Sequence, residues 1–422
     1  MNRPSLPKPP AWLRQPGSRR PLLLGLAVLL AAVVGVAAVV GVAAVVAWPS
    51  SRGGGRASDG KGAAAKVPPV RVTVKPADRA TGVALDAKVR VGVAEGRIGE
   101  VRVTTPSGDT LDGTLTPDSH GWTSAQPLAP GTRYKVTVTA TDAAGATAHS
   151  VASFTTLSPK RVLKASVMPL EGQTIGVGLP VGVWFNHPVA DRAAVERRLE
   201  VETSSGLKGA WRWFSNSEVH FRPERFWPSG EKVTLTLRLA GAKAGPGTWG
   251  VADRTVRFRV GDARVSTVNV HSHTMKVTVN GKVVKVMPVS TGRAKFPTTN
   301  GVHFVIEKTR DKLMDSSTIG IPRDSPDGYF QHVAWSVRIS NSGEFVHAAP
   351  WSVGSQGRAN VSHGCVNLST ANAQWFFKLA QTGDVVTVVG SPKQPNSWTF
   401  GVADWNIPWS RWLAGSALDQ PA

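Results

Sequence analysis

Short runs in which apolar and polar residues alternate recur along this 422-residue chain and limit the folds open to it. Successive side chains of a strand point to opposite faces, so such alternation is typical of half-buried antiparallel strands. The runs are rich in Val and Thr and are separated by Gly and Pro, as strands separated by turns would be. We therefore predict a mainly β protein. Examples are VRVTV at 70–74, KVRVGV at 88–93, YKVTVTA at 134–140 and KVTLTLRL at 232–239.

Two stretches of the chain are similar to each other. LAPGTRYKVTVT begins at Leu128, and FWPSGEKVTLTL begins at Phe226; each precedes a further strand-like run. Repeated units of roughly 90–100 residues with frequent turn signals suggest immunoglobulin-like sandwiches. We expect one such domain at 67–158 and a second at 159–262, acting as spacers.

The N-terminal end combines a basic segment with a long apolar run. Residues 1–20 contain five Lys or Arg residues and no acid, and residues 21–47 contain no charged or strongly polar side chain. A helix over this run would rise roughly 40 Å, enough to cross a hydrocarbon core of about 30 Å. We predict a cytoplasmic segment at 1–20 and a single transmembrane signal-anchor helix at 21–48. A cleaved signal peptide is the alternative, and both place the rest of the chain outside the cytoplasm.

Residues 49–66 are rich in Gly, Ser and Ala and are predicted to be a flexible linker.

The net charge of the chain indicates which surroundings attract it. The chain has 49 Lys and Arg against 28 Asp and Glu, a formal net charge of +21, which favours an anionic cell wall or lipid headgroups. We find no zinc-finger, helix-turn-helix or RNA-binding signature, and therefore expect no nucleic-acid partner.

The remainder of the chain divides into a strand-rich block and a Trp-rich tail. The block, residues 263–391, contains one helix-like stretch that Ser369 is placed to cap and Gly383 to end. The tail, residues 392–422, should pack on a neighbouring domain. Its Trp residues at 405, 409 and 412 would share one helix face, and a further Trp stands at 398.

The only cysteine is Cys365, in the segment VSHGCVNLS. It cannot form an intrachain disulfide, and a free thiol outside the cytoplasm is exposed to oxidation, which favours a role as a nucleophile. A nucleophilic thiol needs a base, which His363 or His347 would supply. Gly364 permits backbone conformations in which the N–H groups of residues 363–365 converge, as an oxyanion hole requires. These residues alone leave the choice of base open, and a buried structural cysteine remains the alternative.

The segment HAAPWSVGSQGRANVSHGCVNLS, residues 347–369, resembles the signature of the L,D-transpeptidases with a YkuD-type catalytic domain. That signature is a His followed at a distance by Ser/Thr-His-Gly-Cys, an apolar residue and Arg or Asn. PVSTG at 288–292, FPTTNGVH at 296–303 and LMDSSTIGIPRDSPDGY at 313–329 also match the family. The order of anchor, two immunoglobulin-like domains, catalytic domain and Trp-rich tail is similar to that of mycobacterial and other actinobacterial members.

The resemblance implies roles for the residues around the cysteine. Cys365 would be the nucleophile, and His347 would be the base and later the acid. The backbone carbonyl of Ala348, where many relatives have Ser, would orient His347. The N–H groups of His363, Gly364 and Cys365 would form the oxyanion hole, with His363 shaping the turn.

The resemblance also implies substrate contacts. Part of the segment between 313 and 329 would form a lid, in which Ile319 stands where close relatives carry an aromatic residue. The implied contact residues are Tyr329, Asn367, Met314 and the backbone of Ser342 and Gly343.

The implied reaction is acyl transfer between peptidoglycan stem peptides, without cofactor or metal. A tetrapeptide donor would acylate Cys365 with loss of D-Ala, and an acceptor stem would then form a 3→3 cross-link. Carbapenem β-lactams would be covalent inhibitors. An L,D-carboxypeptidase, attachment of a protein to the wall through the same thioester, and a non-catalytic wall-binding scaffold are the alternatives.

Two short motifs suggest other chemistries only weakly. SGLK at 205–208 fits the Ser-x-x-Lys pattern of penicillin-binding proteins, but no KTG or SDN partner occurs, and the stretch is predicted to be a turn. HSH at 271–273 has no Cys or carboxylate cluster near it in sequence, so we predict no metal site.

Overall fold

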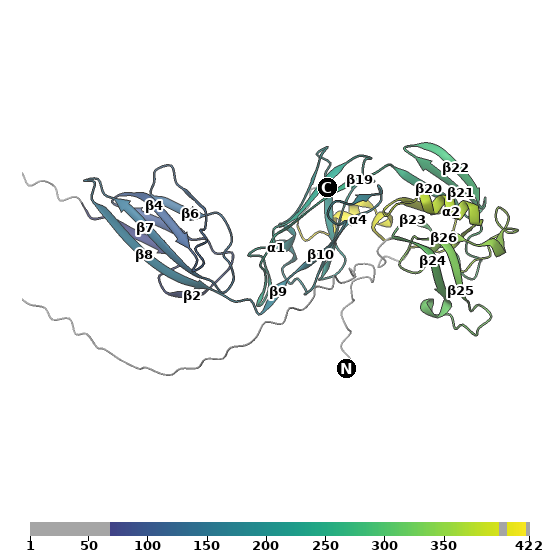
Figure 1. Ribbon diagram of the computed structural model, residues 1–422, viewed down its shortest axis with the longest axis horizontal. Coiled ribbons are helices and arrows are strands. Elements are labelled where there is room, and N and C mark those ends of the chain that lie inside the picture. The colour runs from purple at the N-terminus through teal and green to yellow at the C-terminus, as the bar shows by residue number, and fades with distance from the viewer. Residues whose placement is uncertain (1–67, 396–402, 419–422) are drawn as a thin grey trace, which may run out of the picture. The chain divides into compact units, whose positions relative to one another are not determined.

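The computed structural model describes residues 68–395 and 403–418. The predicted basic segment, transmembrane helix and linker, residues 1–66, lie outside these ranges. Within the described ranges, no helix is long and apolar enough to cross a membrane. The described residues form a mainly β protein with few helices, as the alternating runs predict (Figure 1).

The first group of strands forms two four-stranded sheets, ordered β1-β3-β6-β5 and β2-β8-β7-β4. Alternate residues of β7, from Tyr134 to Ala140, are buried in the shared core, because side chains two positions apart lie on the same face. The strands are β1 (Arg71–Lys75), β2 (Ala80–Val83), β3 (Arg90–Ala94), β4 (Arg97–Thr104), β5 (Gly113–Leu115), β6 (Gly121–Ser124), β7 (Arg133–Thr141) and β8 (Thr147–Thr156).

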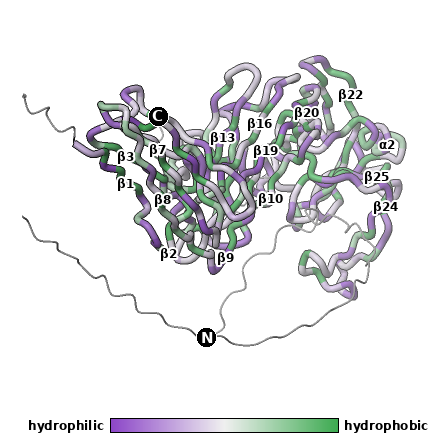
Figure 2. Tube along the Cα trace, turned by 60° about the vertical axis from the view of Figure 1, so that its left-hand side comes forward, coloured by the Kyte–Doolittle hydropathy of each residue, from purple (hydrophilic) through white to green (hydrophobic). Residues whose placement is uncertain are grey.

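The second group contains sheets ordered β10-β12-β15-β14, β11-β19-β16-β13 and β17-β18-β9. Figure 2 shows hydrophobic and hydrophilic residues interleaved along the strands rather than separated into long runs. The elements are β9 (Arg161–Leu163), β10 (Ala165–Met168), β11 (Thr174–Ile175), β12 (Val181–Phe185), α1 (Arg192–Glu196), β13 (Leu199–Thr203), β14 (Gly209–Trp213), β15 (Glu218–Pro223), β16 (Lys232–Leu237), β17 (Lys243–Gly245), β18 (Thr248–Gly250) and β19 (Arg254–Val260).

The third group carries the cysteine. Its sheets are ordered β22-β21-β20-β28-β23 and β24-β25-β26-β27, and helix α2 packs on β25, β26 and β27. The elements are β20 (Arg264–Asn269), β21 (Thr274–Val279), β22 (Lys282–Pro288), β23 (Gly301–Phe304), β24 (Glu307–Asp315), η2 (Ser316–Ile319), β25 (Phe330–Arg338), β26 (Phe345–Ala348), η3 (Pro350–Ser352), β27 (Val366–Leu368), α2 (Thr370–Leu379) and β28 (Val385–Val389).

The ends of α2 differ in how well the sequence predicts them. Ser369 caps the start, since its hydroxyl accepts from Asn372 N at 3.3 Å, as predicted. The helix ends at Leu379, before Gly383, because Ala380 is already extended. The ammonium of Lys308, on β24, donates to the carbonyl of Phe377 at 2.8 Å and satisfies an acceptor of the last turn.

The tail contacts β14 and β15, but not as a single helix. It forms two short helices, α3 (Ala403–Asn406) and α4 (Trp409–Leu413), so the prediction of one Trp stripe along one helix is wrong. Pro408 stands between them, and it lacks the N–H that a continuous helix would need. The Trp rings still converge: the Arg222 guanidinium lies 4.7, 5.2 and 4.4 Å from the ring centres of residues 405, 409 and 412. Trp398 lies outside the described residues.

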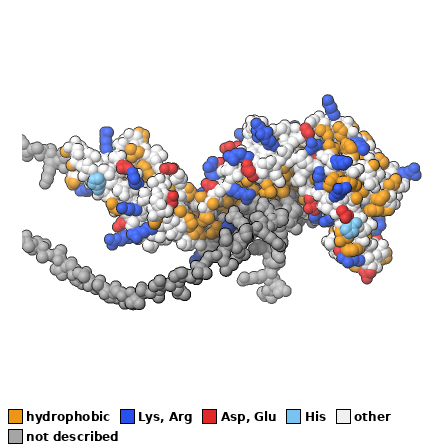
Figure 3. All heavy atoms as spheres, viewed as in Figure 1, with side chains coloured by type: hydrophobic (Ala, Val, Ile, Leu, Met, Phe, Trp, Pro, Cys, Tyr) orange, Lys and Arg blue, Asp and Glu red, His pale blue; other side chains and the backbone are white. Residues whose placement is uncertain are grey.

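Basic side chains do not form one patch on the visible face. Figure 3 shows Lys and Arg scattered over it, with Asp and Glu among them.

Candidate active site

Two parallel strands place the residues of the His347 and Cys365 segments side by side within this fold. In the pairing of β26 with β27, His347 lies opposite Asn367. Cys365 stands directly before β27, two residues from Asn367. Because side chains two positions apart in extended chain share a face, Cys365 and Asn367 point to the side on which His347 lies. The separation of 18 residues in sequence is thus closed by one strand pairing.

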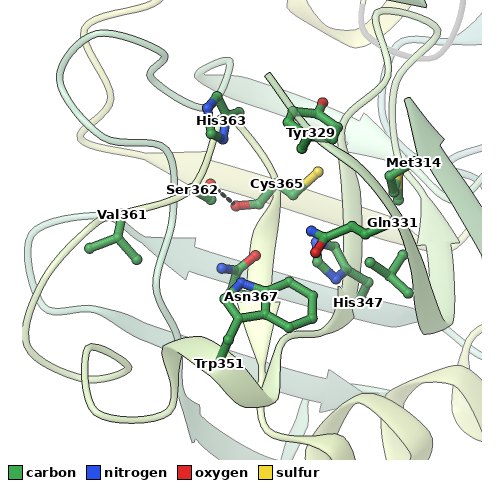
Figure 4. A pocket seen from close by; sticks show the side chains of 11 residues that line it. Met314, Tyr329, Gln331, His347, Trp351, Val361, Ser362, His363, Cys365 and Asn367 are labelled. Carbon is green, nitrogen blue, oxygen red and sulfur yellow. Dashed lines mark hydrogen bonds between the residues drawn. The ribbon is translucent and has the colours of Figure 1, made fainter. Parts of the chain in front are cut away.

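These side chains line one pocket, seen in Figure 4. The sulfur of Cys365 points toward Tyr329 and Met314, and His347 lies on the same side with Gln331. Six of the predicted site residues are among the lining residues. The full lining is Met314, Tyr329, Gln331, Val333, His347, Trp351, Val361, Ser362, His363, Cys365 and Asn367.

Ser342, Gly343 and Gly364 are not among the lining residues. Gly343 still borders the site, because its carbonyl oxygen lies 3.9 Å from Cys365 Sγ. Ser342 is exposed, and its hydroxyl lies 2.9 Å from that of Ser340, so its side chain is engaged outside the pocket.

Sequence reasoning missed five lining residues. Gln331 and Val333 follow Tyr329 at spacings of two along β25, so strand periodicity would have found them once Tyr329 was placed. Trp351 follows His347 by four residues in the matched segment, and its ring lies 6.1 Å from the imidazole. Ser362 occupies the Ser/Thr position of the family signature, which could have marked it, whereas no signal in the sequence distinguished Val361.

His347 is 5% exposed and held in one orientation. Its Nδ1–H donates to the carbonyl of Ala348 at 2.8 Å. This bond makes Nε2 the nitrogen that can accept a proton. Burial lowers the pKa of His347 to about 4, so the imidazole is neutral at pH 7.

The thiol of Cys365 is also neutral at pH 7. It packs against the buried cluster of Met314, Val333 and Phe345. Burial raises its pKa to about 12, and the backbone N–H of Phe345 only partly opposes this. The pair therefore rests as thiol and imidazole, and the proton must move when the sulfur attacks.

The imidazole of His363 is hydrogen-bonded to another side chain, which makes it a different candidate for the base from His347. Its Nε2 lies 2.8 Å from the Arg293 guanidinium, which donates to it. Its ring lies 5.0 Å from that of Phe296 and 5.1 Å from that of Tyr329. Burial and the charge of Arg293 lower the pKa of His363. With Nε2 occupied, His363 is the weaker candidate for the base.

The turn before β27 differs from the expected oxyanion hole in one respect. Gly364 adopts a φ of 123°, as a glycine readily does, and its carbonyl accepts from Thr298 Oγ1 at 2.8 Å. Its N–H, however, donates to Ser362 Oγ at 3.1 Å, and that hydroxyl donates to Cys365 O at 2.6 Å. In this conformation Ser362 Oγ, two residues earlier, accepts from the Gly364 N–H, so the oxyanion hole of residues 363–365 stays a prediction.

Asn367 offers the pocket a polar atom. The residue is 3% exposed, and its Nδ2 donates to Ser352 Oγ at 3.1 Å. In the part of the chain described, its Oδ1 has no hydrogen-bond partner. A buried acceptor without a partner is costly, so this oxygen is suited to receive an N–H from a ligand.

The two weak motifs of the sequence are occupied by structural contacts. Ser205 of SGLK donates its hydroxyl to Glu231 at 2.6 Å, in a turn between β13 and β14. His273 of HSH lies with Nδ1 3.0 Å from Asn360 Oδ1. Neither arrangement resembles a catalytic or metal centre.

Comparison with known proteins gives consistent matches. The family model of the L,D-transpeptidase catalytic domain (YkuD) matches residues 263–388, and that of the bacterial Ig domain matches residues 80–243. L,D-transpeptidase 2 of Mycobacterium tuberculosis (strain CDC 1551 / Oshkosh) is 40% identical over 82% of this chain and 85% of its own. L,D-transpeptidase 5 of the same species (strain ATCC 25618 / H37Rv) is 35% identical over 84% of this chain and 79% of its own.

A solved structure, that of the LD transpeptidase LdtMt1 in complex with imipenem, covers 55% of this chain and 100% of its own. Its sequence identity is 41%, and the TM-score is 0.49.

Proposed function

This chain belongs to the L,D-transpeptidase family, and on that premise we propose how its pocket cross-links peptidoglycan stem peptides. It is an acyl-transferring enzyme with an L,D-transpeptidase catalytic domain. The observation that carries the mechanism is that Cys365 and His347 line one pocket from adjacent parallel strands. We assign Cys365 as the nucleophile and His347 as the base.

The first step forms a thioester. The thiol proton passes to His347 Nε2 as Sγ attacks the carbonyl between the third residue of a tetrapeptide stem and its terminal D-Ala. The C–N bond then breaks, and His347 returns the proton to the amine of the departing D-Ala. The N–H groups of His363 and Cys365 stabilise the oxyanion, and that of Gly364 joins them when it leaves Ser362 Oγ.

The second step transfers the acyl group to an amine. The side-chain amine on the third residue of a neighbouring stem attacks the thioester, passing a proton to His347, and the thiolate of Cys365 leaves. Asn367 Oδ1, which has no partner among the described residues, is placed to accept from that amine. The product is a 3→3 cross-link.

The test is muropeptide analysis by mass spectrometry. The purified full chain should convert tetrapeptide stems into 3→3 dimers with release of D-Ala, and Cys365→Ala and His347→Gln should form none. Tripeptide as the sole product would instead identify an L,D-carboxypeptidase. No product from any stem would favour the wall-binding scaffold, and a stem joined to a protein amine would favour protein attachment.

We further infer that the enzyme works outside the cytoplasm on a membrane anchor. The apolar run at 21–47 and the basic residues before it support this placement, and the net charge of +21 supports attraction to an anionic wall. The strand groups covering 67–158 and 159–262 would act as immunoglobulin-like spacers. Carbonate washing of membranes should leave the protein in the pellet; its release would contradict the anchor.

A further inference from the structure

Residues 316–329, here called the lid, connect β24 to β25 beside the nucleophile. Tyr329 at its end lines the pocket together with Cys365, and both side chains pack against the same apolar cluster of buried residues. Near its start, Ile319 lies against Gly343: a Cβ added to that glycine would meet Ile319 Cγ2 at 3.2 Å. The lid thus borders the thiol from two directions.

Most polar contacts of the lid are internal to it or to its base. Arg323 donates to Asp315 at 2.9 and 2.6 Å, and Asp315 also caps Ser317 N at 3.0 Å. Ser316 N donates to Tyr329 O at 3.0 Å. These bonds maintain the shape of the lid, but they do not attach it to another part of the domain.

Asp327 makes that attachment. Its Oδ2 accepts from Lys295 Nζ at 2.6 Å, and its Oδ1 accepts from the Arg293 guanidinium. Among the ion pairs of the described ranges, these two join the lid to a different segment, the loop between β22 and β23. The hydrogen bond from Lys295 lowers the pKa of Asp327, which is therefore ionised at pH 7.

The arginine of this attachment also contacts the turn that contains Cys365, residues 362–365. The Arg293 guanidinium that holds Asp327 also donates to His363 Nε2 at 2.8 Å and lies 5.0 Å from the Phe296 ring. His363 stands two residues before Cys365. One chain of polar contacts therefore connects the lid to the backbone that carries the nucleophile.

We propose that Asp327 is a positioning residue that fastens the lid through Arg293 and Lys295, and so determines how the thioester divides between an amine and water. This proposal rests on the proposed function. A fastened lid keeps Tyr329 and its apolar neighbours over the thioester and limits the approach of water. An acceptor amine brought by a bound stem reaches the carbonyl by its own contacts, so a loosened lid favours hydrolysis.

The two competing reactions differ only in the attacking group. In transfer, the amine nitrogen bonds to the thioester carbon and gives a proton to His347. In hydrolysis, a water oxygen bonds to that carbon and gives a proton to His347. In both, the C–S bond breaks, and the Cys365 thiolate recovers a proton from His347.

The experiment compares Asp327→Asn with the full wild-type chain at fixed donor and acceptor stems. Asp327→Asn keeps the shape of the side chain and removes its charge. The ratio of tripeptide to 3→3 dimer should rise about two- to fivefold, the effect expected of a partly exposed ion-pair cluster. Added salt should move the wild type toward the variant, because it screens exposed charges.

Asp324→Asn is the matched control, since Asp324 is an exposed carboxylate on the same lid. It should leave the product ratio unchanged. Lys295→Gln should raise the ratio, and adding it to Asp327→Asn should raise it less than the two single effects combined. An unchanged ratio in Asp327→Asn, or an equal rise in Asp324→Asn, would overturn the proposal. A wild type that forms no dimer would reject the proposed function itself, and the proposal with it.

Discussion

Burial keeps both reacting groups of the site neutral. It lowers the pKa of His347 to about 4 and raises that of Cys365 to about 12, so neither group changes its charge between these values. The bond from Nδ1 to Ala348 O then makes the buried imidazole an oriented acceptor rather than an ion. The side chain of Ala348 takes no part in this bond, because the backbone carbonyl accepts it.

A pH profile tests this arrangement. Acylation of the full chain by a carbapenem, followed by intact mass, should proceed at a level rate between pH 5 and 8 and fall as the pH drops toward about 4, where His347 becomes protonated. His347→Gln should slow acylation by about 100-fold or more, and Cys365→Ala should abolish the adduct. A decline centred near the ordinary histidine pKa would contradict a buried neutral base.

At the scale of elements, the pairing of β26 with β27 brings the proposed base and nucleophile together. The loop between β22 and β23 is hydrogen-bonded to the turn that contains Cys365. Thr298, 1% exposed, donates to Gly364 O at 2.8 Å and accepts from Gly292 N at 2.9 Å. One hydroxyl thus joins the loop to the turn that precedes Cys365.

Replacing that hydroxyl should affect catalysis. Thr298→Val keeps the shape but leaves the buried Gly364 carbonyl and Gly292 N–H without this partner, at a cost of about 1–3 kcal/mol. We expect a loss of unfolding free energy in that range and a fall in the rate of D-Ala release. Thr278→Val, which removes a single bond to Val265 O in the other sheet, should leave that rate unchanged. Equal rates for both variants would show that Thr298 does not position the turn.

At the scale of the whole molecule, the second strand group contacts both the third strand group and the tail. Gly176 N and Gly178 N donate to the carbonyls of Thr382 and Gly383, each at 2.8 Å. A Cβ at Gly176 would lie 2.1 Å from Asp384 N, so only glycine permits this approach. The tail makes the other contact, with Asp404 Oδ1 2.7 Å from His220 Nδ1 in a fully buried pair.

The contact between Asp404 and His220 should stabilise the folded state less as the pH becomes alkaline. Although burial opposes it, the carboxylates of Asp404 and Glu218 raise the pKa of His220 to about 9. A raised pKa stabilises the folded state fully below the ordinary histidine value, and this stabilisation is lost as the pH rises through 9.

Unfolding midpoints measured from pH 7 to 10 should therefore fall more in the wild type than in His220→Gln. Parallel curves would show that this pair contributes no pH dependence. His120→Gln, which changes an exposed histidine of the first strand group, is the control and should follow the wild type.

The sequence alone determined the mainly β fold and the L,D-transpeptidase family, whereas the joint action of Cys365 and His347, which the family resemblance implies, stays a prediction. Alternation is a property of neighbouring residues, and the motif around Cys365 is a continuous segment, so both can be read without coordinates. The transmembrane helix stays a prediction, since its residues lie outside the described ranges.

Only the tertiary structure decided which groups meet across distant segments. Asp327 pairs with Arg293, and the Trp side chains of the tail gather around Arg222. Gln331 and Trp351 line the pocket, and the Ser362 hydroxyl accepts from the Gly364 N–H. The pairing of Asp327 and the packing of the tail join residues more than thirty positions apart, and the serine at 362 could equally have turned to solvent. Such contacts depend on how sheets and loops pack, and local periodicity carries no information about that.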